Sequence, residues 1–145
     1  MSTYQIHVFI SHSWTYSGHY DKLESWIFKE KWSVGQASLN FRDYSVPKSH
    51  PIHNARNDRQ LKEAIYTQIR MSHVVLIPTA MYVNYSFWIQ KEIEGAKYYG
   101  KPIIAVHPWP QERKASVVMN NRTAEAGWNK EPLVRTIWEQ YRNAY

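Results

Sequence analysis

The stretch His73-Val74-Val75-Leu76-Ile77-Pro78 decides the fold class of this chain of 145 residues. A continuous apolar run of this length is typical of a strand that is buried on both faces of a parallel sheet. A second such run, Pro102-Ile103-Ile104-Ala105-Val106, follows after a segment with the period of an amphipathic helix, which Gly100 ends. The order strand, helix, strand predicts two parallel strands that are joined by a helical crossover.

The same alternation continues toward the N-terminus. Ile6–Ile10 predicts a first strand, because it is rich in β-branched and aromatic residues and ends in a polar segment. A helix is expected over residues 19–31, with Gly35 as the residue that breaks it. Leu39–Phe41 then predicts a short second strand.

The remaining segments complete the pattern. Residues 42–57 form a polar loop, and Asn57 or Asp58 can cap the helix that follows. The helical spacing there is carried by Leu61, Ala64, Ile65, Gln68 and Ile69. Val117–Met119 predicts a short fifth strand, and Asn129 is expected to cap a last helix. The inward side of that last helix is expected to hold Leu133, Val134, Ile137, Trp138 and Tyr141.

Together these elements predict one domain over residues 1–145 with an α/β fold. The expected architecture is a flavodoxin-like three-layer fold, in which a central, mostly parallel five-stranded sheet of order 2-1-3-4-5 has helices on both faces. In this order the connections change direction between strands one and three, and ligands bind beyond the carboxyl ends of those strands. The loops expected there are Ser11–Trp14 and Thr79–Tyr82.

Composition narrows the class of protein. An apolar content of 43% is ordinary for a globular domain, and no apolar run approaches the ~20 residues of a membrane span. The chain has no cysteine, which excludes disulfides, thiolate metal sites and a cysteine nucleophile. Its first ten residues lack the features of a secretory signal. A cytoplasmic protein fits these observations.

The formal net charge of +6 suits a polyanionic partner such as nucleic acid, acidic lipid or a nucleotide with its phosphates. The basic residues are spread along the chain and form no stripe interleaved with aromatic residues. We therefore expect no nucleic-acid partner and no membrane, and we interpret most of these residues as solvated surface.

Glu92 is the most informative residue of the helix that precedes Gly100. On a helical wheel at about 100° per residue, Glu92 falls in the apolar arc. That arc holds Trp88, Ile89, Ile93, Ala96 and Tyr99, and the opposite side holds Gln90, Lys91, Glu94 and Lys97. An unpaired carboxylate in a dry site costs several kcal/mol or shifts its pKa, so its presence points to a cleft or a chemical role. The alternative is that Glu92 lies at the edge of the stripe and pairs with a Lys or Arg.

Four segments resemble TIR domains in their order and spacing. Val8–His12 resembles the first strand with its Ser-rich loop, and Phe41–Pro47 resembles the second strand with the BB loop. Ser86–Ile93 is similar to the αC motif of NAD-cleaving members, Trp-x-x-x-Glu followed by an aliphatic residue. Lys101–Val106 resembles the fourth strand. The resemblance covers nearly the whole chain and is nearest to stand-alone bacterial TIR proteins of the ThsB type, from Thoeris antiphage systems.

The resemblance implies an activity and a catalytic residue. Catalytic TIR domains break the bond between nicotinamide and ribose in NAD, and prokaryotic members often release a cyclised or conjugated ADP-ribose as a signal. The family's catalytic glutamate corresponds to Glu92, and the tryptophan before it corresponds to Trp88. The chain would then be an NAD nucleosidase or ADP-ribosyl cyclase of antiphage defence. It has neither a GxGxxG nor a Walker motif, so NAD is expected as a substrate and not as a cofactor.

Further residues are candidates for substrate binding. Ser11 and His12 can donate hydrogen bonds to phosphate or ribose oxygens. Ser86 either caps the helix of Glu92 or contacts the ribose. Tyr44 and Trp109 are candidates for stacking on the adenine.

Two candidates and one histidine pair have competing explanations. Trp88 either lines the nicotinamide or ribose side of the site or belongs to the core or an interface. Arg42 either meets the pyrophosphate or pairs with Asp43. His50 and His53 have no carboxylate or cysteine at ligand spacing, so we expect no metal.

The alternative function is a non-enzymatic TIR module that signals by homotypic assembly through the BB-like loop. The presence of Glu92 favours the enzyme, because many modules of that kind lack a glutamate at this position. A response-regulator-like switch would need acidic residues at the strand ends, and Ser11-His12-Ser13 supplies none. For the enzyme we expect a downstream effector that is reached through a diffusible nucleotide, and a homo-oligomer is plausible for such a family.

Overall fold

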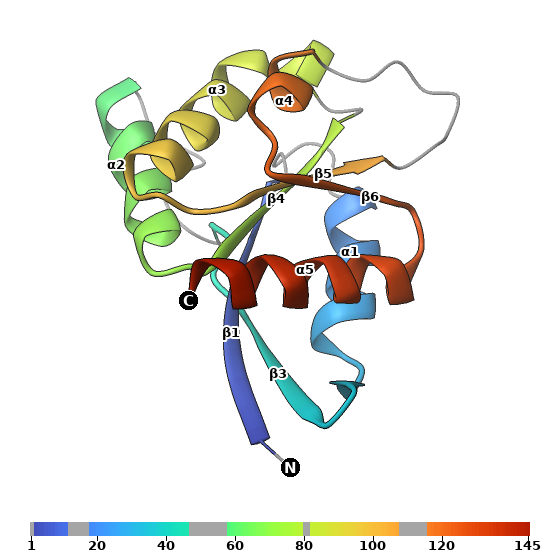
Figure 1. The fold of residues 1–145 in the computed structure, drawn as a ribbon. Helices are drawn as coiled ribbons and strands as arrows, with labels where there is room; N and C mark the ends of the chain where they lie inside the picture. The colour runs from blue at the N-terminus through green and yellow to red at the C-terminus, as the bar shows by residue number, and fades with distance from the viewer. Residues whose placement is uncertain (1, 12–17, 47–57, 80–81, 108–115) are drawn as a thin grey trace.

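A six-stranded sheet forms the centre of the computed structural model, with the strand order β2-β3-β1-β4-β5-β6 (Figure 1). The strands are β1 (Ser2–Ile10), β2 (Trp32–Val34), β3 (Ala37–Asp43), β4 (Val74–Pro78), β5 (Ile103–His107) and β6 (Ala124–Gly127). The helices are α1 (Gly18–Phe28), α2 (Asp58–Arg70), α3 (Tyr82–Tyr98), α4 (Ser116–Asn121) and α5 (Lys130–Ala144). The structure describes residues 2–11, 18–46, 58–79, 82–107 and 116–145, and only the backbone of residues 18, 58, 61 and 82–88.

Five of the strands are parallel and follow the predicted order. Strand β1 pairs with β3 on one side and with β4 on the other, β4 pairs with β5, and β5 pairs with β6. With the short β2 set aside, this is the order 2-1-3-4-5, which confirms the flavodoxin-like prediction. The switch point therefore lies between β1 and β4.

The predicted number of strands is wrong by one, because β2 adds an antiparallel edge strand to β3. Helix α1 ends at Phe28 and not at Lys31, so Gly35 lies in the turn of this hairpin and does not end a helix. The indole of Trp32 donates a hydrogen bond to the carbonyl oxygen of Trp26, 2.7 Å away, and so ties β2 to α1. A strand of three residues is too short to show a periodic pattern in the sequence.

The predicted fifth strand at Val117–Met119 is wrong, because these residues lie in α4. Val118 is the buried residue of this helix, as expected for one short helical segment packed on the sheet. The edge strand beside β5 is instead β6, which consists of Ala124, Glu125, Ala126 and Gly127. Small and polar residues suffice at a half-exposed edge, so β6 has no apolar run that could reveal it in the sequence.

Two apolar layers cover the two faces of the sheet. Val74 and Leu76 of β4 belong to the layer beneath α1 and α5, and Val75 and Ile77 belong to the layer beneath α2, α3 and α4 (Figure 1). All four side chains are fully buried. Strand β4 is thus buried on both faces, as its continuous apolar run predicts.

The ends of two helices follow the sequence signals. Gly100 has a φ of 66°, and the N–H groups of Gly100 and Lys101 donate hydrogen bonds to the carbonyl oxygens of Lys97 and Ala96. This is a Schellman motif, which needs a left-handed residue and so confirms Gly100 as the end of α3. Asn129 occupies the N-cap position of α5, but its side chain makes no capping hydrogen bond.

Other helix predictions are settled only in part. Asp58 is the first residue of α2, whereas the alternative cap Asn57 lies outside the described residues.

In the described part of the chain, no helix combines the length and the apolar character that a bilayer span requires.

His73 lies in an aromatic cluster just before β4. Its Nδ1 accepts a hydrogen bond of 2.8 Å from the backbone N–H of His7, so this nitrogen carries no proton. Its ring also contacts the rings of Tyr141 and Tyr145. The pKa of His73 is lowered from 6.5 to about 4. Burial is the largest cause, and the charges of His7 and Lys101 contribute less.

We predict that the protein loses stability as the pH falls from about 6.5 to about 4, because the unfolded chain binds a proton at His73 before the folded chain does. The loss from this residue is at most about 3 kcal/mol and is complete below the folded pKa. Urea unfolding at a series of pH values measures it. His73→Asn keeps an acceptor near the Nδ1 position and removes the titration, so its stability should fall less; an equal fall in both proteins would contradict the prediction.

Candidate functional site

Polar residues follow the strands at the carboxyl edge of the sheet, on both sides of the switch point. Ser11 follows β1, Thr79 follows β4, and His107 is the last residue of β5. All three are buried, with exposed fractions of 0%, 3% and 8%. The N–H of Ser11 donates a hydrogen bond of 2.9 Å to the carbonyl oxygen of Leu76, which holds the end of β1 beside β4. Folds of this order bind ligands at this edge.

These three residues face the same side of the sheet as α3. Side chains alternate along a strand, so each shares its face with the residue two positions earlier. Those earlier residues are Phe9, Ile77 and Ala105, and all belong to the apolar layer beneath α2 and α3. A hydrogen bond between Thr79 and His107 agrees with this orientation.

Glu92 lies on the side of α3 that packs on this face of the sheet. Only 1% of the residue is exposed. Its helix neighbours in the same apolar layer are Ile89, Ile93 and Ala96. The opposite side of the helix is exposed at Gln90, Glu94 and Lys97. The structure therefore places Glu92 inside the apolar stripe and not at a solvent-exposed edge of it.

Helix α3 leads away from the carboxyl edge, because it connects the end of β4 to the start of β5. Glu92 follows the first helical residue, Tyr82, by about ten positions, or about 15 Å at 1.5 Å per residue. A ligand that enters at the edge must therefore extend between α3 and the sheet to reach this carboxylate.

A chain of hydrogen bonds links the ends of β4 and β5 to β6. Thr79 Oγ1 lies 3.1 Å from His107 Nδ1, and His107 Nε2 lies 3.3 Å from Glu125 Oε2. A carboxylate only accepts, so in the neutral imidazole ring Nε2 carries the proton and Nδ1 is an acceptor. The single proton of the Thr79 hydroxyl can go to this Nδ1 or to the carbonyl oxygen of Val106, 3.3 Å away. Arg122 Nε also pairs with Glu125 Oε2, at 3.1 Å.

Sequence reasoning named Thr79 only as the start of a ligand-binding loop, and it did not single out His107 or Glu125 as site residues. His107 carries a detectable signal, since it directly follows the apolar run Pro102–Val106 and must lie at the carboxyl end of that strand. Glu125 carries none, because the sequence predicts the edge strand at other residues.

Tyr44 lies beside β1, just after the end of β3. Its ring stacks on the ring of His7 with 4.2 Å between centroids, and its N–H donates a hydrogen bond of 2.8 Å to the carbonyl oxygen of Val8. His7 in turn contacts the ring of His73. Tyr44 is thus joined to the cluster that precedes β4, and its role toward adenine stays a prediction.

Arg42 lies in β3 and is exposed. The pairing with Asp43, one of its two predicted roles, is not seen among the described residues. The Asp43 carboxylate accepts hydrogen bonds from the hydroxyl of Tyr20 and from the N–H of Ser45. Burial first, and then Asp43, raise the pKa of Tyr20, so its phenol stays a donor. The Ser45 hydroxyl accepts from the N–H of Ile10 at 2.8 Å and so ties β3 to β1.

Four other predicted site residues have no described side chain. His12 and Trp109 lie outside the described residues. Ser86 and Trp88 lie in the first half of α3, where only the backbone is described. The expectation that Ser86 caps this helix is wrong, because α3 begins at Tyr82 and Ser86 lies inside it. Trp88 precedes Glu92 by one helical turn.

The two other predicted histidines, His50 and His53, also lie outside the described residues. Within the described ranges, no group of three His, Asp or Glu side chains is placed to hold a metal ion.

The sheet order defines a flavodoxin-like α/β domain, with polar residues at the carboxyl edge on both sides of the switch point. A family model described as "Thoeris protein ThsB, TIR-like domain" matches residues 9–113, from the end of β1 to beyond β5. This chain belongs to that family, which confirms the resemblance to TIR proteins of Thoeris antiphage systems. No curated protein matches the chain.

We predict that His107→Leu lowers the free energy of unfolding by about 1–2 kcal/mol, because it removes the partner that Thr79 and Glu125 share. The loss stays moderate because the Thr79 hydroxyl also lies 3.3 Å from the carbonyl oxygen of Val106. His107→Gln can replace one of the two hydrogen bonds and should lose less. Urea unfolding of the three proteins measures the difference, and a leucine variant as stable as the wild type would contradict the prediction.

Proposed function

We propose that this protein cleaves NAD between nicotinamide and ribose, with Glu92 as the catalytic carboxylate. The product would be a cyclised or conjugated ADP-ribose that signals to a downstream effector in antiphage defence. The observation that carries the proposal is the burial of Glu92, which is 1% exposed and packs toward the face of the sheet that holds Ser11 and Thr79. Membership in the ThsB family of TIR-like domains supports it.

The chemistry needs one carboxylate and no general acid. The bond between the ribose carbon and the nicotinamide nitrogen breaks, and its electron pair leaves with nicotinamide, which thereby loses its positive charge. The ribose develops oxocarbenium character, as in glycoside hydrolysis. An ionised carboxylate against the sugar stabilises that charge, most of all where water is excluded. Water, or a nucleophile of the same or another molecule, then completes the reaction and gives up its proton.

The residues at the carboxyl edge would orient the substrate. The buried hydroxyl of Ser11 has no hydrogen-bond partner among the described residues and can bond to a ribose or phosphate oxygen. Thr79 lies on the same face and is held by His107. The net charge of +6 favours the approach of a dinucleotide. NAD would extend inward from this edge, and a homo-oligomer could complete the site.

We predict that Glu92→Gln lowers the rate of nicotinamide release by about 10²–10³, because the neutral amide cannot stabilise the developing positive charge. Chromatography of nicotinamide and of the nucleotide product measures the rate. Glu94→Gln is the matched control, since Glu94 lies on the exposed side of the same helix. It should retain the wild-type rate.

The outcomes separate the two candidate functions. Equal rates in wild type and Glu92→Gln, with both proteins folded, would refute the role of Glu92. If the purified protein releases no nicotinamide, extracts of phage-infected cells that express the wild type or Glu92→Gln supply a possible trigger. No new ADP-ribose product in those extracts would favour the non-enzymatic assembly module.

A further inference from the structure

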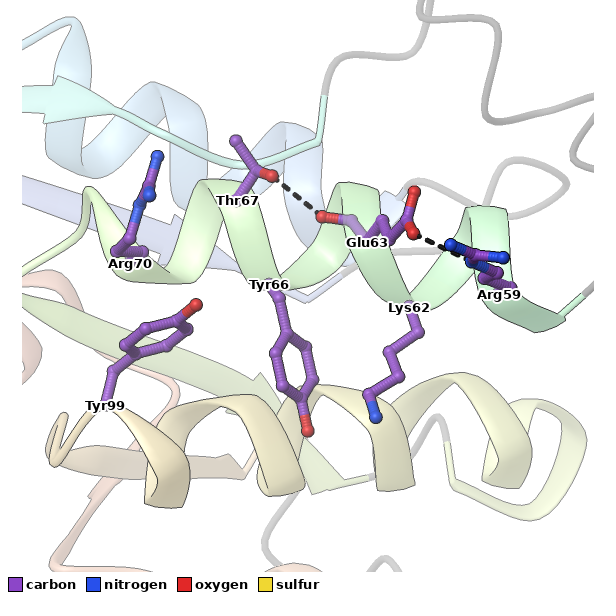
Figure 2. A pocket seen from close by; sticks show the side chains of 7 residues that line it. All are labelled: Arg59, Lys62, Glu63, Tyr66, Thr67, Arg70 and Tyr99. Carbon is purple, nitrogen blue, oxygen red and sulfur yellow. Dashed lines mark hydrogen bonds and ion pairs between the residues drawn. The ribbon is translucent and has the colours of Figure 1, made fainter.

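A groove runs along the outer side of α2, away from the sheet. It has a volume of about 540 Å³, which is within the range of small-molecule sites. Figure 2 shows the side chains that line it, from α2 and from Tyr99 just after α3. The lining includes Arg59, Lys62, Glu63, Tyr66, Arg70 and Tyr99.

The helical period gathers the α2 residues of this groove on one side. Arg59, Lys62, Tyr66 and Arg70 follow one another at intervals of three or four positions, which places them on one face of a helix. Ile65 and Ile69 lie on the other side, in the apolar layer beneath α2. The groove is therefore separated from the inward-facing site of Glu92 by the helices themselves.

Three tyrosines gather beside the groove, and two of them, Tyr66 and Tyr99, line it. The ring of Tyr66 lies 6.0 Å from those of Tyr98 and Tyr99, and the last two lie 4.9 Å apart. Tyr66 also packs on Gly95 of α3, where an added Cβ would lie 3.0 Å from the ring. The glycine thus allows the ring to sit close on α3. Tyr98 is 74% exposed, an unusual exposure for a large aromatic side chain.

The charge of the groove is positive. Three cations line it against one carboxylate, and that carboxylate, Glu63, is already paired with Arg59 at 3.1 Å. Lys62 Nζ lies 5.2 Å from the centroid of the Tyr66 ring, so a cation and an aromatic ring lie within reach of one small molecule. Burial, and then Glu94, raise the pKa of Tyr66, so its phenol stays a neutral donor.

We propose that this groove binds an anionic ligand that carries a flat aromatic ring, which is the chemistry of a nucleotide. The ring would pack against Tyr99, beside Tyr66, and the phosphate would lie against Lys62, since Arg59 already pairs with Glu63. An extended acidic peptide is the weaker fit. The Lys62 ammonium and the Tyr66 ring lie side by side, so they match the phosphate and the aromatic ring of one compact molecule better than a row of carboxylates. The proposal goes beyond the proposed function and does not depend on turnover at Glu92.

The test is a titration of the full-length protein carrying Glu92→Gln, followed by the amide NMR signals. The probes are AMP, adenosine, inorganic phosphate and a peptide of twelve glutamates, which we choose to separate the two halves of the ligand and the alternative occupant. We expect AMP to shift the signals of α2 and of Tyr98–Gly100 in a saturable way. Adenosine and phosphate alone should bind at least about ten-fold more weakly.

Two variants locate the binding. Lys62→Gln should weaken the binding of AMP by about ten-fold, because it removes the cation beside the ring. Lys97→Gln is the matched control, since it removes an equal charge from an exposed position outside the groove lining. It should leave the affinity unchanged.

The proposal would be overturned if AMP caused no saturable shifts, or if the shifts were confined to the signals around Glu92. It would also be overturned if both variants weakened the binding of AMP equally, or if the acidic peptide bound and AMP did not. Loss of NAD cleavage leaves this titration unaffected, so a failure of the proposed function and a failure of this site are distinguishable.

Discussion

The parallel pairing of β4 with β1 on one side and β5 on the other is the constraint on which the rest of this structure depends. A strand in that position is covered on both faces, and the four residues Val74–Ile77 are fully buried. Their alternation divides the core into two layers, one for each pair of large helices. It also brings the ends of three strands to one edge.

The same arrangement of layers buries Glu92 between α3 and the sheet. A carboxylate among Ile89, Ile93 and Ala96 opposes the apolar layer around it, and a fold retains such a residue where it serves a purpose. In the proposed cleavage of NAD, Glu92 would stabilise the oxocarbenium-like ribose, a cation that forms only during the reaction. A dry site strengthens the attraction between that cation and the carboxylate. Burial of Glu92 would therefore raise the rate of bond cleavage.

The two faces of α2 and α3 serve different ends. Their inner faces complete the apolar layer that surrounds Glu92, and their outer faces form the positive groove with its tyrosines. Gly95 connects the two, because it lets the Tyr66 ring approach α3 closely while Ala96 packs inward. One helix pair can in this way present a buried carboxylate to one ligand and exposed cations to another without mixing the two charges.

The sequence by itself determined the class of fold, the positions of four parallel strands and the place of Glu92 on the apolar arc of its helix. These follow from local periodicity, since apolar runs mark strands buried on both faces and a wheel marks the inward side of a helix. Only the tertiary structure decided the edge strands and the link between Thr79, His107 and Glu125. Such features have no local pattern, because they arise when segments far apart in the chain meet. Whether a short segment becomes an edge strand depends on the strand with which it pairs. Whether Thr79, His107 and Glu125 form a chain of hydrogen bonds depends on the register of three strands.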